Sequence, residues 1–548
     1  MSWSVNSGQH TLSTEVLDGN LPQEVDVVVV GGGAAGCVLA ARLSEDPACR
    51  VLLLESGTTT GREQASRIPG MALTLLAGEA AWPDVTAPQS ALDGRRVYLV
   101  QGRGLGGGSS MNAMVWFHGH PADFDTWAKL GAGGWSWADV APVFGALESH
   151  ELGPNAWHGV DGPMTVTQPR DVTSMPLAFL AAGAELGLGV TGDFNGERRE
   201  GFGLFSSNIR DGVRHSVVDG YLSRAAGREN LLIRTGCHAT RIVTDGTRAR
   251  GVTVSRGSEH ASTDVLARQA VVLAAGALRS PQLLMLSGIG PAGHLAEHGI
   301  PIVRDLPGVG RNLQDHAMVT PVWPVTDGSP LRNALTAADE RAYQLARRGP
   351  LASLCQAGAM LRTDASLTAP DIQVILVLQG TTSDMQLIQE PVVTAALSLL
   401  APKSTGTVRL ASADPAQPPI ADPRYLTHPD DRATMRAGLH LLKRIFDSKA
   451  LSAVTAAPIE PTSWTDEALD SWIRSNAATE LHPAGTCAMG TGEQAVVDPA
   501  TMAVHGFDNV YVADSSAMPT VTRGNLHAPV IMLAERAAQR IRNRLAGD

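Results

Sequence analysis

The segment between Val25 and Glu55 limits the fold of this 548-residue chain more than any other part of its sequence. A β-branched run predicts a strand over 25–30, a small-residue stretch predicts a helix over 34–43, and an apolar run over 50–54 predicts a buried second strand. Glycines fill the junction after the first strand. The segment therefore predicts a parallel strand, helix and strand unit with a tight turn at its start.

The turn carries a G-x-G-x-x-G fingerprint made by Gly31, Gly33 and Gly36. The first glycine suits the tight turn, the second lets the backbone approach a pyrophosphate, and the third permits close packing of helix on sheet. Glu55, nineteen residues past Gly36, can accept hydrogen bonds from ribose hydroxyls and disfavours a 2′-phosphate. The unit predicts an adenine dinucleotide that is not NADP, and it does not separate FAD from NAD. The alternative is a glycine-rich turn that binds nothing.

Composition excludes several other classes of protein. The net charge of -11 comes without any Lys/Arg run, which disfavours nucleic acid and anionic membranes as partners. The longest apolar run, 392–401, is shorter than the ~18 to 20 residues of a membrane span. Five scattered cysteines favour neither a disulfide framework nor a thiolate metal site. The polar segment 1–24 predicts a surface arm without a secretory signal, and a cytoplasmic location.

A chain of this length exceeds the ~250 to 300 residues of a single core, so two domains are expected. Sequence patterns predict strands over 231–234, 250–254 and 270–274, the last followed by a helix that begins at Ser280-Pro281. Further strands are expected over 371–378 and 407–410, and an amphipathic helix over 430–446.

Several blocks in the rest of the chain resemble the glucose-methanol-choline (GMC) family of flavin oxidoreductases, over residues 25–537. Residues 102–114 read GRGLGGGSSMNAM and residues 276–290 read GALRSPQLLMLSGIG, which are similar to the two family signatures. The other similar blocks are 308–316 (GVGRNLQDH), 404–426 (ending DPRYL), 482–490 (HPAGTCAMG) and 513–529 (ADSSAMPTVTRGNLHAP).

The resemblance implies an α/β (α+β overall) fold in two interleaved parts. A doubly wound, Rossmann-like FAD-binding domain is expected over 1–155, 200–300 and 477–548. An antiparallel-sheet substrate-binding domain is expected over 156–199 and 301–476, with the active site where the two domains meet.

The resemblance also implies an FAD site. The expected cofactor residues are Gly31, Gly33, Ala34, Ala35, Gly36, Glu55, Ser56, Arg103, Gly108, Ser109, Asn112, Ala113, Met114, Val115, Ala239, Asp514 and His527. His527 stands where many relatives have asparagine, and it either anchors the backbone or adds a donor to the cofactor. Some relatives carry a histidine bonded covalently to the flavin where this chain has Met111. Methionine cannot form that bond, which predicts a dissociable FAD.

The implied reaction is the oxidation of a small-molecule alcohol to an aldehyde or ketone. His482 is the expected general base, hydride passes to flavin N5, and Asn525, which cannot titrate, orients the substrate oxygen. Dioxygen or a quinone-type acceptor would reoxidise the flavin. The family block that contains His316 assigns this histidine no proton role. His482 and Cys487 make only one loose pair, so no metal is expected.

Two residues have several interpretations. Glu480 could raise the pKa of His482, select cationic or hydroxyl-rich substrates, or point to solvent. Trp116 could contact the substrate or belong to the core. Two other functions remain as alternatives: a lyase that resembles hydroxynitrile lyases on the same scaffold, and a non-catalytic flavin-binding protein.

Overall fold

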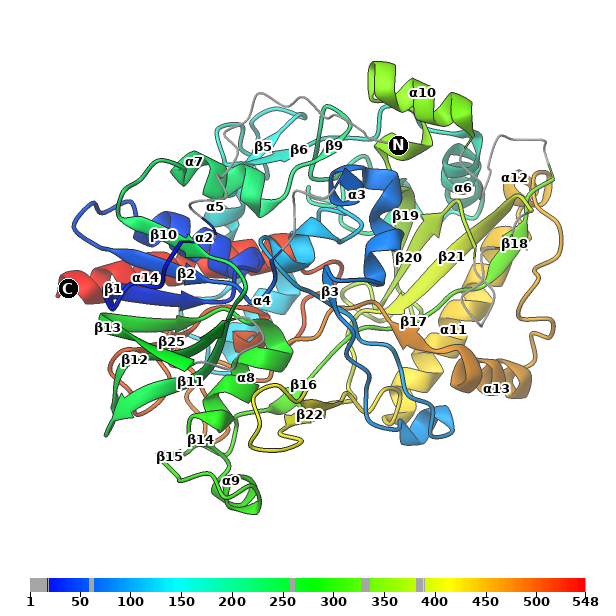
Figure 1. Cartoon of the computed structure of the whole chain (residues 1–548). Helices are drawn as coiled ribbons and strands as arrows, with labels where there is room; N and C mark the ends of the chain where they lie inside the picture. The colour runs from blue at the N-terminus through cyan, green and yellow to red at the C-terminus, as the bar shows by residue number, and fades with distance from the viewer. Residues whose placement is uncertain are drawn as a thin grey trace.

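The computed structural model describes residues 17, 19–58, 64–256, 262–326, 336–380, 388 and 390–547, and it is built around two large sheets (Figure 1). Most of the surface arm expected over 1–24, from residue 1 to 16, lies outside the described residues. Within the described part of the chain, no helix combines the length and the apolar character needed to cross a bilayer.

The first sheet is mainly parallel and contains the strand, helix and strand unit. Its order is β10-β2-β1-β13-β12-β11, with β25 also paired to β13. β13 pairs in parallel with β1 and β25, and the β11 to β13 pairs are antiparallel. The strands are β1 (Glu24–Val30), β2 (Val51–Leu54), β10 (Leu231–Arg234), β11 (Cys237–Asp245), β12 (Arg248–Arg256), β13 (Ser262–Leu273) and β25 (Val510–Val512).

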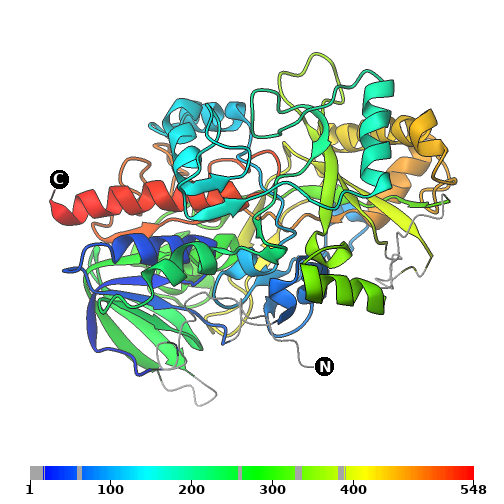
Figure 2. The same ribbon diagram turned by 90° about the horizontal axis from the view of Figure 1, so that it is seen from above.

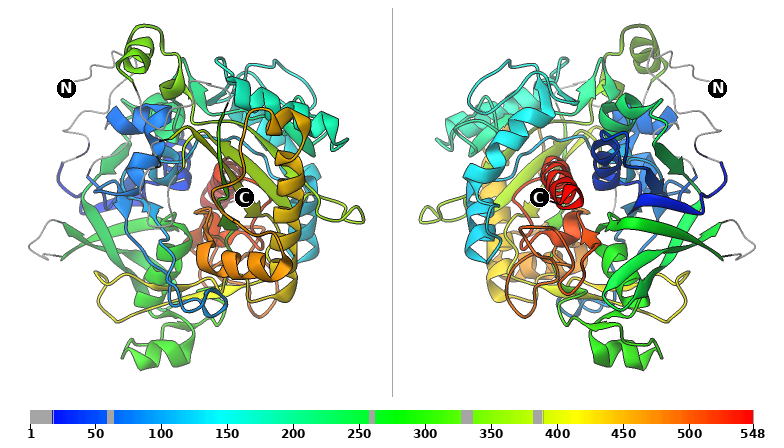
Figure 3. Two further views of the ribbon diagram at one scale, coloured as in Figure 1. Left: turned by 90° about the vertical axis from the view of Figure 1, so that its right-hand side faces the viewer. Right: turned by 90° about the vertical axis from the view of Figure 1, so that its left-hand side faces the viewer.

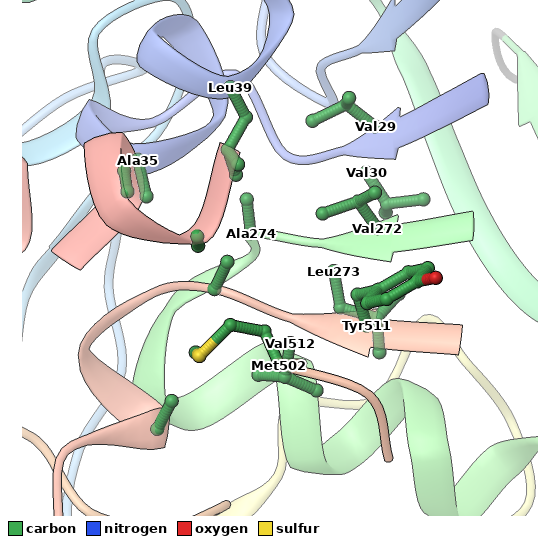
Figure 4. Close-up of a cluster of buried hydrophobic side chains, with 14 of the residues drawn as sticks. Val29, Val30, Ala35, Leu39, Val272, Leu273, Ala274, Met502, Tyr511 and Val512 are labelled. Carbon is green, nitrogen blue, oxygen red and sulfur yellow. The ribbon is translucent and has the colours of Figure 1, made fainter. Parts of the chain in front are cut away.

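The core of this part lies between the sheet and its helices. β1 buries six successive residues, as expected of a parallel strand that is covered on both faces. Figure 4 shows Val29, Val272 and Tyr511 on adjacent strands, with Leu39 of the covering helix above them. This packed core therefore fixes the C-terminal ends of the parallel strands, where the glycine turn begins.

The second sheet is antiparallel throughout. Its order is β24-β17-β21-β20-β19-β7, with β18 also paired to β21. The strands are β7 (Gly201–Leu204), β17 (Ala317–Val319), β18 (Val322–Pro324), β19 (Cys355–Leu361), β20 (Ile372–Val377), β21 (Val392–Leu399) and β24 (Ala478–Thr479). A three-stranded sheet adds β16 (Arg311–Leu313), β22 (Gly406–Arg409) and β23 (Ile420–Asp422).

The helices are distributed over both sheets. α14, near the C-terminus, packs against α2 and α5, and Figure 2 shows it running alongside α2. α6 and α11 cover the antiparallel sheet, on the side of the molecule opposite the parallel sheet in Figure 3. Within the described residues, the α-helices of six or more residues are α2 (Ala34–Leu43), α4 (Pro121–Lys129), α5 (Trp137–Leu147), α6 (Ser174–Glu185), α8 (Gly276–Leu286), α9 (Ala292–Glu297), α10 (Ala337–Ala346), α11 (Pro429–Phe446), α13 (Asp466–Asn476) and α14 (His527–Ala546).

Most expected elements are present within one or two residues of their predicted bounds. The strand expected over 270–274 is longer, because β13 begins at Ser262, where it pairs with β12. The helix α8 begins at Gly276 and not at Ser280-Pro281. The proline lies inside the helix because the carbonyl that its missing N–H would bond, that of Ala277, accepts a hydrogen bond from Thr486 Oγ1 at 2.6 Å instead. The side-chain hydroxyl satisfies the carbonyl and the helix continues.

The expected domain boundaries differ from the strand pairing in two places. β7 and β24 belong to the antiparallel sheet, although boundaries at 200 and 477 assign both strands to the FAD-binding domain. β24 pairs with β17, which brings the segment just before His482 to the edge of the antiparallel sheet. The loop that contains His482 therefore begins at the second sheet, and the interleaved division itself stays a proposal.

Candidate active site

The glycine turn after β1 has the geometry that the fingerprint requires. Gly31 has a φ of 101°, and a Cβ there would lie 2.6 Å from the carbonyl oxygen of Ala274. A Cβ on Gly36 would lie only 1.8 Å from the carbonyl oxygen of Gly31. At Gly33 the nearest atom to an added Cβ would be 3.9 Å away, so space lies open in front of this residue. Gly31 and Gly36 therefore allow close packing of the backbone, and Gly33 faces space that a ligand can fill.

Glu55 has a structural task beyond the one expected from the sequence. Its Oε2 accepts a hydrogen bond from the N–H of Gly32 at 2.8 Å. Its Oε1 accepts from the N–H groups of Gly57 at 2.7 Å and Gly104 at 2.8 Å. The carboxylate thus joins the glycine turn to the 102–114 loop, and Oε2 keeps a free lone pair for a ribose hydroxyl.

A cleft at the ends of β1 and β2 brings together three of the predicted cofactor residues, Gly31, Ser56 and Ala239. His238 also lines it, and its Nδ1 lies 3.0 Å from Ser56 Oγ. Sequence analysis missed His238, which no motif marks. The guanidinium of Arg103 stacks over the Trp82 ring at 4.6 Å, and its buried Nε has no partner among the described residues.

The loop that follows Gly108 is tied to a buried arginine that sequence analysis also missed. Arg214 Nη1 donates to Asn112 Oδ1 at 2.6 Å and to the carbonyl of Ser109 at 3.2 Å. Its Nη2 is buried without a partner among the described residues. Met114 has a φ of 61°, a strained value for a residue with a side chain, and Val115 forms a bridge to Ser207.

Asp514 and Met111 have local partners. Asp514 accepts hydrogen bonds from the N–H of Gly276 at 2.8 Å and from Ser280 Oγ at 2.5 Å, which fastens the start of α8 to the segment after β25. Met111 is buried beside Leu75 and Val100.

The predicted catalytic pair is brought together from distant parts of the chain. His482 Nε2 lies 3.5 Å from Asn525 Nδ2, and the Asn525 oxygen accepts from Gln373 Nε2 at 3.3 Å. Gln373 comes from β20, and its Oε1 has no hydrogen-bond donor among the described residues. An imidazole, an amide and an unpaired carbonyl therefore meet at one place.

The backbone of the His482 loop is held by Asp315. The carboxylate accepts from the N–H of His482 at 2.8 Å and from Thr479 Oγ1 at 2.5 Å, and Tyr425 also donates to it. Leu481 has a φ of 65°, so the residue before His482 is strained and stays so because these hydrogen bonds over-determine the loop. The family block 308–316 thus runs alongside the catalytic loop and supports it.

Glu480 and His316 complete the site. His316 Nδ1 lies 3.0 Å from His482 Nδ1. Glu480 Oε2 lies 3.5 Å from His316 Nδ1 and 3.6 Å from His482 Nδ1. The Glu480 side chain is only 7% exposed, so it does not point to solvent. The sequence offered no sign that His316 joins this group, because residues 166 positions apart meet only through the pairing of β17 with β24.

Trp116 belongs to the core and not to the substrate site. Its side chain is 1% exposed, and its indole N–H donates to Glu148 Oε2 at 3.0 Å. The ring meets the His527 imidazole edge to face, with 5.5 Å between the ring centroids. His527 is buried, and burial followed by the charge of Arg214 lowers its pKa to about 3. It is therefore a neutral imidazole at the start of α14.

Glu148 is the centre of a buried ionic network. His118 Nε2 lies 3.1 Å from one carboxylate oxygen and His158 Nδ1 lies 2.6 Å from the other, while His158 Nε2 lies 2.8 Å from Asp193. Burial opposes the charge on His158, but hydrogen bonds to Asp193 and Glu148 raise its pKa from 6.5 to about 9. Burial likewise opposes the charge of Glu148, but the two histidines lower its pKa from 4.5 to about 2.

Replacing Glu148 with glutamine is expected to destabilise the protein by about 3 kcal/mol, because it leaves a buried imidazolium short of one partner. The pKa of His158 is raised by folding, so its contribution is complete below pH 6.5 and is lost as the pH rises through about 9. The contribution of Glu148 is present above pH 4.5 and is lost as the pH falls through about 2. Urea midpoints should differ most between wild type and Glu148→Gln near pH 6 and converge above pH 9. A constant difference across this range would contradict the network.

A glycine-lined turn on a mainly parallel sheet, with an imidazole and an amide paired in loops beside an antiparallel sheet, is an arrangement typical of a dinucleotide-dependent oxidoreductase. Family models described as GMC oxidoreductase match residues 25–318 and 402–534. The chain belongs to the GMC oxidoreductase family, and it is an FAD-binding flavoenzyme as the members of that family are.

The chain is similar to several relatives along most of its length. It is 40% identical to an uncharacterised GMC-type oxidoreductase of Mycobacterium tuberculosis, over 94% of this chain and 99% of that one. It is 37% identical to the oxygen-dependent choline dehydrogenase of Brucella ovis (95% and 96%) and 36% identical to an alcohol dehydrogenase [acceptor] of Pseudomonas putida (94% and 95%).

Solved structures show the same architecture. Pyridoxine 4-oxidase from Mesorbium loti superposes with a TM-score of 0.87 at 34% identity, covering 95% of this chain and 99% of that one. Formate oxidase of Aspergillus oryzae superposes with a TM-score of 0.89 at 25% identity, covering 96% and 99%.

The residues present fit FAD. Open space faces Gly33, and an added Cβ on Gly108 would meet no atom within 4 Å. The buried Arg103 Nε and Arg214 Nη2 lack partners among the described residues, which is what a polar ligand would supply. Gly33 belongs to the turn, and Arg103 and Gly108 to the loop, that the sequence predicted for the cofactor, whereas Arg214 reaches this loop from β9 (Val213–Arg214).

Proposed function

We propose that this protein oxidises the CH–OH group of a small-molecule alcohol to an aldehyde or ketone, with His482 as the general base. One observation carries the proposal: His482 Nε2 and Asn525 Nδ2 lie 3.5 Å apart beside the unpaired carbonyl of Gln373. A hydroxyl placed there can give its proton to the imidazole while the amide donates to its oxygen.

The protonation state of His482 suits this task. Burial lowers its pKa to about 4, although Glu480 raises it, so the imidazole is neutral at pH 7 and can accept a proton. The hydroxyl proton passes to Nε2 as the O–H bond breaks and the C=O bond forms. FAD, when bound, accepts the hydride that leaves the carbon. Asn525 stays neutral and holds the substrate oxygen throughout.

The turn and loop glycines would hold the diphosphate, and Arg103, Ser109 and Asn112 would contact the polar parts of the cofactor. Met111 supports a dissociable FAD, because a thioether cannot form the covalent bond. Dioxygen or a quinone-type acceptor would complete turnover. The named activities of the choline dehydrogenase, alcohol dehydrogenase and pyridoxine oxidase relatives support an alcohol as the substrate.

The decisive experiment mixes the purified holoenzyme anaerobically with a panel of primary, secondary, aromatic and amino alcohols and follows the flavin absorbance. Bleaching by one class of alcohol is expected, with the corresponding carbonyl as product. Admitting air and measuring peroxide then separates an oxidase from a dehydrogenase. A flavin that stays oxidised with every alcohol in the panel would rule the proposal out.

A further inference from the structure

The carboxylate of Glu480 is a buried charge with no complete set of partners. Oε1 accepts one hydrogen bond, from Asn525 Nδ2 at 3.3 Å. Oε2 has no hydrogen-bond donor among the described residues, although it lies within 3.6 Å of the Nδ1 atoms of both His316 and His482. A buried carboxylate is maintained only where charge or hydrogen bonds compensate it. Its oxygens therefore face the catalytic pair itself.

We propose that Glu480 is a positioning residue for His482: together with His316 it holds the imidazole with Nε2 toward the substrate and balances the positive charge that the imidazole gains. The inference rests on the proposed alcohol oxidation, in which His482 takes the hydroxyl proton. It assigns a task to a carboxylate that the sequence left with three interpretations.

The contact between the two imidazoles defines the resting tautomer. A hydrogen bond between two Nδ1 atoms 3.0 Å apart contains one proton. If His316 holds that proton, neutral His482 carries its own on Nε2 and cannot act as a base. If His482 holds it, Nε2 is free to accept, and this is the tautomer that the proposed proton transfer requires. Glu480 Oε2 lies 3.6 Å from His482 Nδ1 and 3.5 Å from His316 Nδ1, so the carboxylate lies beside the shared proton in either arrangement. The carboxylate then stabilises the imidazolium formed when Nε2 is protonated.

Among the titratable groups described around His482, Glu480 is the anion that lies beside its imidazole ring. Asp315 accepts from the backbone N–H of His482 and is occupied by Thr479 and Tyr425. Cys355 of β19 interacts with Glu480, and burial raises the pKa of its thiol to about 12, so it is uncharged. Ser398, which interacts with Glu480, and the amides of Gln373 and Asn525 do not titrate.

Glu480 is itself ionised at neutral pH. Burial raises its pKa, but the facing His482 and His316 lower it by more, and the resulting pKa lies below the ordinary value. A cationic substrate would be an alternative counter-charge. However, Oε2 lies beside two ring nitrogens and Oε1 is bonded to Asn525, so both oxygens are directed at the catalytic residues. The geometry favours a partner of the histidine over a substrate contact.

A direct test observes the imidazole of His482 in the oxidised holoenzyme by NMR with ¹³C-labelled histidine, assigned by the signal lost in His482→Asn. As the pH falls from 8 to 4, the wild-type signal should begin its protonation shift. In Glu480→Gln the onset should move to lower pH by about 1 unit, because the carboxylate no longer stabilises the imidazolium. Identical titrations in the two proteins would overturn the proposal. This readout needs no turnover, so it stands even if no alcohol is oxidised.

Steady-state kinetics give the second readout. In Glu480→Gln, kcat should fall on the order of a hundredfold, the acid limb of the kcat/KM profile should move to lower pH, and Glu480→Asp should recover part of both. The flavin spectrum and the thermal midpoint establish that the variants are folded and loaded. An unchanged profile with a KM increase confined to cationic alcohols would instead make Glu480 a substrate contact and refute the positioning role.

Metal analysis closes the test, because the ligand atoms of His316, Glu480 and His482 all lie within 4.8 Å of one another. Two imidazoles and a carboxylate could also coordinate a transition-metal ion. This grouping was not expected from the sequence, where His482 had only Cys487 as a loose partner. A stoichiometric metal that is lost in Glu480→Gln would overturn the proposal, whereas full activity and the same titration after chelation support it.

Discussion

Replacing His482 with alanine is expected to reduce the turnover of alcohols by roughly 10²- to 10⁴-fold, the range that a positioned general base contributes. The variant loses the ring nitrogen, Nε2, that lies 3.5 Å from Asn525 Nδ2. His316 contacts the other ring nitrogen of His482, Nδ1, and so does not replace it. FAD content should stay unchanged, because His482 is not among the residues that we propose to hold the cofactor. Stopped-flow flavin reduction measures the effect on the chemical step itself.

A matched control is His440→Ala. The His440 side chain is 43% exposed on α11, where it pairs with Asp466, and its loss should leave flavin reduction at the wild-type rate. If His482→Ala reduced flavin at that same rate, His482 would not be the base. If His482→Ala lost its yellow colour, the residue would belong to the cofactor site instead.

Substituting alanine at Gly36 is expected to destabilise the fold by about 3 kcal/mol, the upper end of ordinary overpacking. The new Cβ would lie 1.8 Å from the carbonyl oxygen of Gly31, which is backbone and cannot move aside without opening the turn. The same change at Gly33 meets no atom closer than 3.9 Å and should leave the apoprotein as stable as wild type. Gly33→Ala should nevertheless lose FAD, because the methyl group fills the space in front of the turn.

Thermal unfolding with and without added FAD separates the two effects. Wild type should gain stability with FAD, since a ligand that binds only the folded state raises its midpoint. Gly33→Ala should have the thermal midpoint of the wild-type apoprotein but should not gain stability when FAD is added. Gly36→Ala should have a lower thermal midpoint already as the apoprotein. Gly293→Ala, where nothing lies within 4 Å of the new methyl, serves as the control and should behave as wild type. Equal apoprotein midpoints in all three variants would contradict this division of tasks.

Sequence patterns located the elements that depend on local chemistry. The β1, α2 and β2 unit has the predicted bounds to within one residue, because strand propensity, glycine freedom and helix propensity all act over a few residues. The start of α8 was wrong because Thr486, more than 200 residues away, satisfies the carbonyl that Pro281 leaves unpaired. Such a hydrogen bond has no local signature.

The residues of the candidate site likewise fall into those that sequence motifs predicted and those that only tertiary contacts revealed. His482 and Asn525 were predicted through the family blocks that contain them, and the structure places them 3.5 Å apart. Arg214, Gln373 and the roles of Asp315 and His316 were missed, because each acts through a contact between segments far apart in the chain. For Trp116 the sequence left a substrate contact and a place in the core both open, and the structure shows its indole in the core, where the N–H donates to Glu148.

The sequence by itself determined the glycine turn after the first strand and the acidic residue after the second, a pattern that predicts a dinucleotide at Gly31. Its resemblance to the family also singled out a histidine and an asparagine as the expected base and neutral donor. Only the tertiary structure decided where Glu480 lies. Whether a carboxylate faces solvent, substrate or histidine depends on which segments pack around it, and here the pairing of β17 with β24 brings His316 beside it and encloses both with His482. Burial and proximity, which turn a charged side chain into a partner of its neighbour, are properties of the folded chain alone.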